Sequence, residues 1–264
     1  MVSLAFDPYN LVLALIFSMV LQAVFFVFAA WLKTDKVTDL TYSLTFFLMA
    51  LGLLLNRTDA SRSHVLLAFM VIFWAFRLGS YLLRRIIFMG KDARFDGIRE
   101  NFFSFLLFWF FQGLTVWVTM LPVIFALSVD RALPSGTAMS IGSGIWLVGL
   151  IIESVADQQK FNFKSKEENK DRWIDSGLWK YSRHPNYFGE MLVWWGIFIS
   201  TVPILAGWNW ALIIGPIFIC CILLFFSGIP PLERKYAERY KGNSEFENYR
   251  KRTSLLIPWP PARS

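Results

Sequence analysis

"YSRHPNYFGEMLVWWGIFIS", residues 181–200, begins with polar and charged side chains and continues as an almost wholly apolar run. A run of about 20 apolar residues is long enough to cross a hydrocarbon core of about 30 Å as an α-helix. Six similar runs recur along the chain, so the pattern is not that of one cleaved N-terminal signal. We therefore predict an all-α integral membrane bundle of about seven transmembrane helices. The spans cover about residues 9–32, 39–55, 65–83, 102–129, 141–159, 187–206 and 208–229.

Composition supports a membrane protein and excludes several other classes. Hydrophobic residues make up 56% of the chain, with 27 Phe and 12 Trp, which does not describe a water-soluble surface. The two cysteines are adjacent, at positions 220 and 221, so they offer no disulfide framework. With His64 and His184 as the only histidines, no metal centre is expected.

The net charge of +7 fits either a nucleic-acid surface or the orientation of a membrane protein. When alternate loops are assigned to opposite sides, one side receives 22 of the 26 Lys and Arg residues. These include Lys91 and Arg94, the connection 160–183 and the C-terminal tail. We expect the N-terminus outside and the C-terminus in the cytoplasm, and no nucleic-acid partner.

Polar side chains enter the spans in pairs that share a helix face, which is costly in a bilayer and indicates a polar cavity or a partner. Purely structural explanations are also open: cations can snorkel, Asp39 can cap a helix, and lysines can orient the chain in the membrane. Adjacent carboxylates on one face need a cation or donors between them. The pairs are Asp39 with Tyr42, Arg77 with Tyr81, Glu153 with Asp157, and Asn186 with Glu190; a fifth polar group, Glu233 with Arg234, lies just beyond the last span.

Two motifs, "DSGLWKYSRHPNYFGEMLVWWG" (175–196) and "YRKRTSLLIPWPP" (249–261), resemble a known superfamily. It contains steroid 5-alpha-reductases, sterol reductases and isoprenylcysteine carboxyl methyltransferases. The chain looks most like its steroid 5-alpha-reductase-like DUF1295 branch. The resemblance covers roughly the last 110 residues well. We expect a single integral membrane domain over residues 1–264, with substrate-side spans in 1–139 and a cofactor-binding region in 140–264.

The resemblance implies an NADPH cofactor. The reductases hold the nicotinamide with an Asn and a carboxylate four residues apart, which match Asn186 and Glu190. The related methyltransferases have Ser at the Asn position and lack the acid. No GxGxxG fingerprint is present, so a Rossmann mode is not expected. The residues predicted to bind the cofactor are Glu153, Asp157, Lys164, Arg172, Tyr181, Arg183, His184, Asn186, Tyr187, Glu190, Glu233, Arg234 and Tyr236.

The implied reaction is reduction of a C=C bond conjugated to a carbonyl in a lipophilic substrate. A positioned donor would stabilise the negative charge that develops on the carbonyl oxygen. The similar enzymes use a Glu and a Tyr, which match Asp39 and Trp74 here. Because an indole is no useful general acid, proton delivery would pass to Asp39, Tyr42 or Tyr81. We expect a protonated Asp39 to polarise the carbonyl.

Two alternatives stay open on the sequence. The first is an S-adenosylmethionine-dependent membrane methyltransferase, which "SRHPNYFGE" and the Glu233–Arg234 pair would also suit. The second is a non-catalytic protein that binds sterol or membrane lipid. The expected location is a bacterial inner membrane or the endoplasmic reticulum.

Overall fold

The computed structural model describes residues 6–90, 92 and 95–261, and over these ranges the chain is helical apart from turns, loops and isolated bridges such as that between Ser182 and Ser254. Seven of the described helical segments are long and apolar enough to cross a membrane, which confirms the predicted all-α bundle with seven spans. Lys91, Arg94 and Arg263, counted above among the cations of one side, lie outside the described residues.

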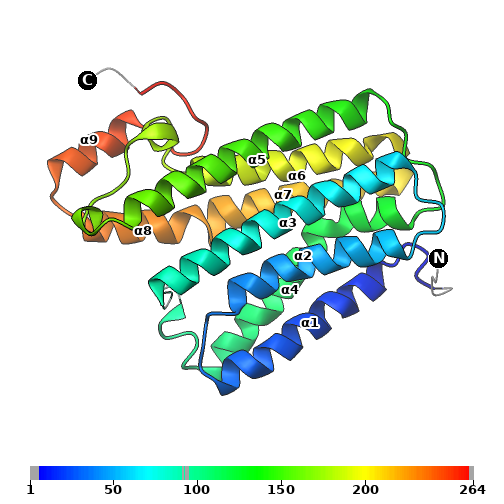
Figure 1. The fold of residues 1–264 in the computed structure, drawn as a ribbon, viewed down its shortest axis with the longest axis horizontal. Helices are drawn as coiled ribbons and strands as arrows, with labels where there is room; N and C mark the ends of the chain where they lie inside the picture. The colour runs from blue at the N-terminus through cyan, green and yellow to red at the C-terminus, as the bar shows by residue number, and fades with distance from the viewer. Residues whose placement is uncertain (1–5, 91, 93–94, 262–264) are drawn as a thin grey trace. The chain divides into compact units, whose positions relative to one another are not determined.

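The elements follow one another along the chain with short connections (Figure 1). Apolar residues make these segments helical because only an α-helix satisfies its own backbone hydrogen bonds in lipid. The first four long helices are α1 (Leu11–Trp31), α2 (Thr38–Leu55), α3 (Arg62–Met89) and α4 (Phe102–Ser128). The next are α5 (Thr137–Lys164), α6 (Pro185–Thr201), α7 (Ile214–Cys221), α8 (Ile229–Arg239) and α9 (Ser244–Arg252).

The last predicted span differs from one continuous α-helix. It begins as a 3-10 turn, η5 (Gly207–Ile213), becomes α7, and continues as a π-helical stretch, η6 (Ile222–Phe226). A π-helix widens each turn, and the chain then bends so tightly that a Cβ on Gly228 would lie 2.4 Å from the Leu223 carbonyl oxygen. Sequence hydropathy reports apolar length and not helix type, so it could not predict this change.

The chain divides into two compact units, which we describe separately. Unit 1 comprises residues 1–143 and 197–215, and unit 2 comprises residues 144–196 and 216–264. In unit 1, α2 packs against α3, and α1 packs against α4.

Buried amides join three helices of unit 1. Gln112 Nε2 donates to Gln22 Oε1 at 2.9 Å, and Gln22 Nε2 donates to Thr45 Oγ1 at 2.9 Å. Gln112 Nε2 also lies 3.1 Å from the backbone oxygen of Thr38. Because each donor finds an acceptor, this network links α1, α2 and α4 without leaving those amide nitrogens unpaired in an apolar interior.

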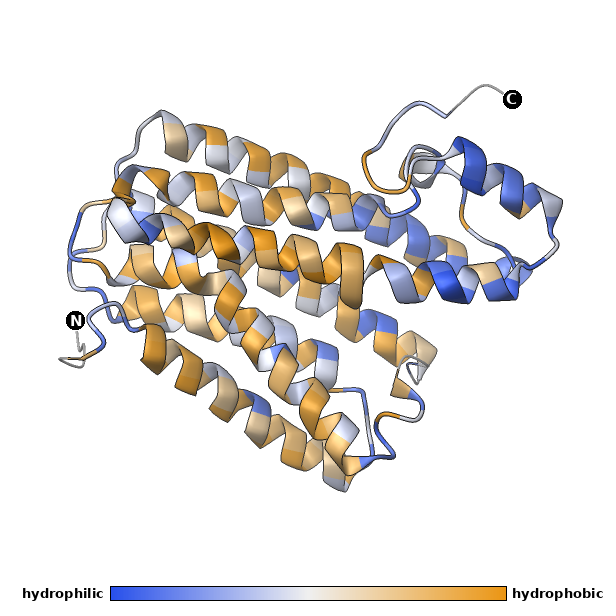
Figure 2. Ribbon diagram, turned by 180° about the vertical axis from the view of Figure 1, so that it is seen from behind, coloured by the Kyte–Doolittle hydropathy of each residue, from blue (hydrophilic) through white to orange (hydrophobic). Residues whose placement is uncertain are grey.

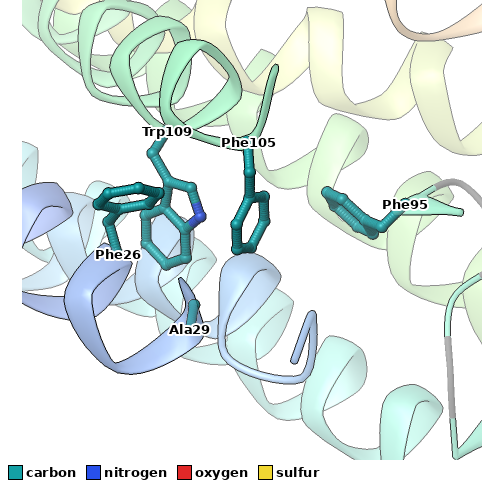
Figure 3. Close-up of a cluster of buried hydrophobic side chains, with 5 residues drawn as sticks. All are labelled: Phe26, Ala29, Phe95, Phe105 and Trp109. Carbon is teal, nitrogen blue, oxygen red and sulfur yellow. The ribbon is translucent and has the colours of Figure 1, made fainter. Parts of the chain in front are cut away.

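An aromatic cluster completes the packing of α1 on α4 (Figure 3). The rings of Phe26 and Phe105 lie 5.8 Å apart, and Phe26 meets Trp109 edge-on at 6.4 Å. Ala29 leaves room for these rings, and Phe95 joins them from the connection before α4. Tilted aromatic pairs of this kind add to the stabilisation from dispersion.

In unit 2, α5 and α6 touch backbone to backbone at two glycines (Figure 1). A Cβ on Gly149 would lie 2.6 Å from the Gly189 oxygen and 2.7 Å from the Val193 nitrogen. A Cβ on Gly189 would lie 2.6 Å from the Glu153 nitrogen. The two helices therefore run antiparallel, and the crossing brings the acidic face of α5 onto the start of α6.

Outside the apolar part of unit 2, the polar segments fold around their own aromatic core. Trp173, Tyr240, Phe246 and Tyr249 pack together, with Trp173 and Tyr240 ring centroids 5.2 Å apart. Figure 2 shows hydrophilic residues concentrated on α8, α9 and the C-terminal end of α5. The polar tail after the last span therefore folds as two short helices, α8 and α9.

Candidate functional site

The face of α5 that lies towards α6 carries two buried carboxylates. Glu153 and Asp157 are 2% and 4% exposed. Asn186, in the first turn of α6, donates from Nδ2 to Asp157 Oδ1 at 3.3 Å. The contact places the predicted acid and amide together because Gly149 and Gly189 let the two helices approach closely.

The other half of the Asn186 amide is not satisfied by the described part of the chain. Its Oδ1 is buried and accepts no hydrogen bond from any residue in that part. A buried carbonyl oxygen without a donor is unfavourable by about 1 to 3 kcal/mol. Asn186 can therefore accept a hydrogen bond from a ligand at little further cost.

A second polar cluster lies just before α6. Arg183 Nη1 pairs with Glu233 Oε2, and His184 Nε2 lies 2.9 Å from Glu233 Oε1. Arg250 approaches the same carboxylate at 3.8 Å. The ring of Tyr187 stacks on His184 with centroids 5.6 Å apart and an interplanar angle of 5°. Glu233, supplied by α8, thus binds two side chains of the motif that the sequence singled out.

The C-terminal segment holds this motif in place. The backbone N–H of Arg183 donates to the Ser254 oxygen at 2.8 Å, and Ser182 Oγ donates to the Leu256 oxygen at 2.6 Å. Tyr249 donates its hydroxyl to the Trp179 oxygen at 2.9 Å. A hollow remains between these elements, lined by Trp173, Ile174, Trp179, Arg183, Glu233, Tyr236, Phe246 and Tyr249.

Burial controls the charge of the two groups outside the spans. It lowers the pKa of His184 below its usual 6.5, an effect that the hydrogen bond to Glu233 opposes and that Lys160 and Arg183 reinforce. His184 is therefore neutral near pH 7, its Nε2–H donates to Glu233, and its Nδ1 is a buried acceptor with no partner among the described residues. Burial also raises the pKa of Tyr249, which keeps its hydroxyl protonated as a donor.

We expect the protein to lose stability below about pH 6.5, partly through His184. In the unfolded chain His184 takes up a proton near its usual pKa of 6.5, whereas in the folded chain its lowered pKa delays uptake. The contribution is thus present above pH 6.5 and is lost as the pH falls below it. Thermal unfolding midpoints measured from pH 8 to pH 5 in about half-unit steps check this. The unfolding midpoint of His184→Gln, which keeps a donor for Glu233, should fall less steeply as the pH is lowered. Equal slopes of midpoint against pH in the two proteins would contradict this role of His184.

Other predicted cofactor residues are placed more loosely. Tyr236 lines the hollow, and Glu190 is half-buried one turn beyond Asn186 on α6. Lys164 Nζ donates to the backbone oxygen of Arg172, and the Arg172 side chain is exposed. Tyr181 and Arg234 are also exposed. The structure brings Asp157 to Asn186, and Arg183 and His184 to Glu233, whereas the side chains of Arg172, Tyr181 and Arg234 are exposed.

The predicted catalytic residues lie on α2 and α3 of unit 1. Asp39 accepts a hydrogen bond from Arg85 Nη2 at 2.6 Å, and Arg85 also contacts Asp92 at 3.3 Å. Asp39 therefore lies in an ion pair with Arg85. Arg85 lies two residues beyond the predicted span 65–83 and was not recognised as the partner of Asp39.

Trp74 is fully buried, and its ring meets Phe46 edge-on at 5.2 Å. Phe46 in turn meets Tyr42 edge-on at 5.0 Å. Tyr81 lies two turns after Trp74 on α3 and is half-buried. Trp74 therefore forms part of the packed interior of unit 1, which suits shaping a slot better than delivering a proton.

Sequence reasoning missed the aromatic residues around the hollow. Trp173, Phe246 and Tyr249 sit within charged segments, "KDRWIDSG" and "SEFENYRKR". A lone large aromatic residue between charges signals a local core, because such a ring is rarely left in water.

These features define a multi-pass helical membrane protein whose polar site lies where α5, α6 and α8 meet in unit 2. The chain belongs to the family described as "Protein of unknown function (DUF1295)", whose model matches residues 25–253. This agrees with the resemblance drawn from the two motifs.

Relatives are similar to part of the chain. It is 30% identical over 118 residues to the 3-oxo-5-alpha-steroid 4-dehydrogenase 1 of Bos taurus, which is 45% of this chain and 40% of that enzyme. The Mus musculus enzyme is also 30% identical, over 45% of this chain and 41% of its own length. The chain thus spans well under half of these relatives. An uncharacterised Schizosaccharomyces pombe protein is 22% identical over 71% of the chain and 63% of its own length. No solved structure gives a significant match.

Proposed function

We propose that the protein is a membrane-embedded reductase that uses NADPH to reduce a C=C bond conjugated to a carbonyl in a lipophilic, steroid- or isoprenoid-like substrate. The observation that carries the proposal is the Asp157–Asn186 pair, together with the buried Oδ1 of Asn186, which has no partner among the described residues. The similarity of part of the chain to 3-oxo-5-alpha-steroid 4-dehydrogenases supports it.

The residues present suit the cofactor. Asn186 and Glu190 would hold the carboxamide, which has both a donor and an acceptor to match them. Arg183 has a buried Nε without a partner among the described residues and would face phosphate, with His184 beside it. When bound, NADPH supplies the hydride that such a reduction requires.

In unit 1, we propose that the polar face of α2 and α3 meets the substrate carbonyl. Tyr42 and Tyr81 carry phenolic hydroxyls that can donate to an oxygen on which charge develops. The Asp39–Arg85 ion pair would then orient these donors and hold charge near them, while Trp74 would limit the width of the slot. The proton for the α-carbon would come from one of the two tyrosines.

The remaining predictions on organisation stand as proposals. We propose one integral membrane domain, with the substrate side in residues 1–139 and the cofactor side in 140–264. The excess of cations on one set of loops supports a cytoplasmic C-terminus and an external N-terminus. A cytoplasmic site would draw on the soluble cofactor pool of either a bacterium or a eukaryotic cell.

The methyltransferase alternative has less support from the site. It relied on an acidic-basic pair formed by Glu233 and Arg234. Glu233 is occupied by Arg183 and His184, whereas Arg234 is exposed.

Thermal unfolding of the purified full chain with each cofactor tests the proposal. NADPH at about a hundredfold its Kd should stabilise the protein by about 2.7 kcal/mol, and S-adenosylmethionine should have no effect. Asn186→Leu should weaken NADPH binding about tenfold or more, because Asp157 and the carboxamide both lose a partner.

Asn162→Leu is the matched control, since Asn162 is an exposed asparagine on α5 of the same unit, and it should bind NADPH as the natural chain does. Stabilisation by S-adenosylmethionine alone would replace the reductase with a methyltransferase. Binding of NADPH without its oxidation by any of a panel of lipophilic enones would favour a non-catalytic binder.

A further inference from the structure

The segment after α9, residues 253–261, is a non-helical strip with two different faces. Its backbone is paired with the residues just before α6, through Arg183 to Ser254, Ser182 to Leu256 and the Trp259 N–H to the Tyr181 oxygen at 3.1 Å. Exposed and half-buried side chains alternate along it. Leu255, Ile257 and Trp259 are 41%, 58% and 70% exposed, whereas Ser254, Leu256 and Pro258 are half-buried.

The position of this strip follows from its partner. Residues 181–183 immediately precede α6, which begins at Pro185 and is one of the seven apolar spans. A segment paired with 181–183 therefore lies within about one helical turn of the membrane surface. At that depth, Trp and aliphatic side chains that are exposed on the protein can enter the boundary between headgroups and acyl chains.

The charged residues next to the strip indicate what it binds. Residues 249–261 contain Arg250, Lys251 and Arg252 and no acidic residue. Arg250 contacts Glu233 and Glu247, but the side chains of Lys251 and Arg252 are exposed. Figure 2 shows an apolar stretch in the tail directly after the hydrophilic helix α9. An apolar strip flanked by free cations matches an anionic lipid surface, which attracts Lys and Arg and accepts Trp and Ile.

We propose that residues 255–259 form an interfacial anchor, whose Leu255, Ile257 and Trp259 insert into the headgroup region of the bilayer that the chain spans, with Lys251 and Arg252 on anionic headgroups. The anchor does not depend on the reductase activity. Because the opposite edge of the strip hydrogen-bonds residues 181–183, lipid contact would also hold the Arg183–Glu233 cluster in place.

Spin labels on the full-length protein in single-copy nanodiscs test the anchor. With Cys220 and Cys221 replaced by Ser, labels are placed through Ile257→Cys and Trp259→Cys on the outward face. Lys241→Cys, in the exposed turn between α8 and α9, is the aqueous control. We expect the labels at 257 and 259 to collide more with oxygen than with a water-soluble nickel chelate, and the label at 241 to show the reverse. Collision behaviour at both outward sites that matches position 241 would overturn the proposal.

A second experiment distinguishes contact with lipid from contact with another copy of the protein, and it tests the role of Lys251 and Arg252. In nanodiscs that contain phosphatidylglycerol, Lys251→Gln combined with Arg252→Gln should weaken insertion of the strip into the headgroup region about fivefold for each charge removed. The spin label at position 257 reports this insertion. Lys241→Gln should leave insertion unchanged. Equal insertion in neutral and anionic nanodiscs would overturn the role of the two cations. Protection of the label that appears only when several copies share one membrane would assign the strip to a second copy, and would overturn the lipid anchor.

Discussion

Gly189→Ala is expected to destabilise the protein by about 3 kcal/mol or more, and to leave little folded protein after purification. The added Cβ would lie 2.6 Å from both the Gly149 oxygen and the Glu153 nitrogen. Both are backbone atoms of α5, so no side chain can rotate to make room. The helices would have to separate, which moves Asp157 away from Asn186. The gain in helix propensity from Gly to Ala, about 1 kcal/mol, does not offset this.

The thermal midpoint of unfolding and the yield of monodisperse protein check this prediction. Gly144→Ala is the matched control because Gly144 lies on α5, the helix that Gly189 contacts, and a Cβ there meets no atom within 4 Å. That variant should be as stable as the natural chain or slightly more stable. If Gly189→Ala has an unchanged midpoint, the backbone contact between α5 and α6 does not exist as described.

Glu233→Gln is expected to lower stability by about 2 to 3 kcal/mol. The change removes the charge that Arg183 and His184 share and leaves the Arg183 guanidinium, 15% exposed, without its carboxylate. Removing one partner of a fully buried ion pair costs about 3 to 5 kcal/mol, and we lower the figure because these side chains retain some contact with water.

Unfolding midpoints of Glu233→Gln, Glu233→Asp and Glu238→Gln test the cluster together. Glu238 is exposed on the same helix α8, so its loss should change stability by no more than about 0.5 kcal/mol. Glu233→Asp keeps the charge on a shorter side chain and should recover part of the loss. Similar midpoints for Glu233→Gln and Glu238→Gln would show that the Arg183–Glu233–His184 cluster does not stabilise the fold.

Several features could be predicted from local sequence. The seven spans followed from apolar length alone, because lipid requires about 20 residues to cross it and requires them to be helical. The helices differ from prediction mainly at their ends: α3 continues to Met89 and α5 to Lys164. Charged residues end a hydrophobic run but need not end a helix, which can continue into water.

The sequence by itself determined that the chain is a helical membrane protein and that polar and charged side chains gather in the motif before α6, because hydropathy and residue type are local properties. Only the tertiary structure decided which partners those residues take. Glu233 reaches Arg183 across 50 residues, Ser182 meets Leu256 across 74, and Arg85 meets Asp39 across 46. Such pairs depend on where helices cross, and the crossing of α5 and α6 depends on Gly149 and Gly189, whose missing side chains leave no signal in hydropathy or charge.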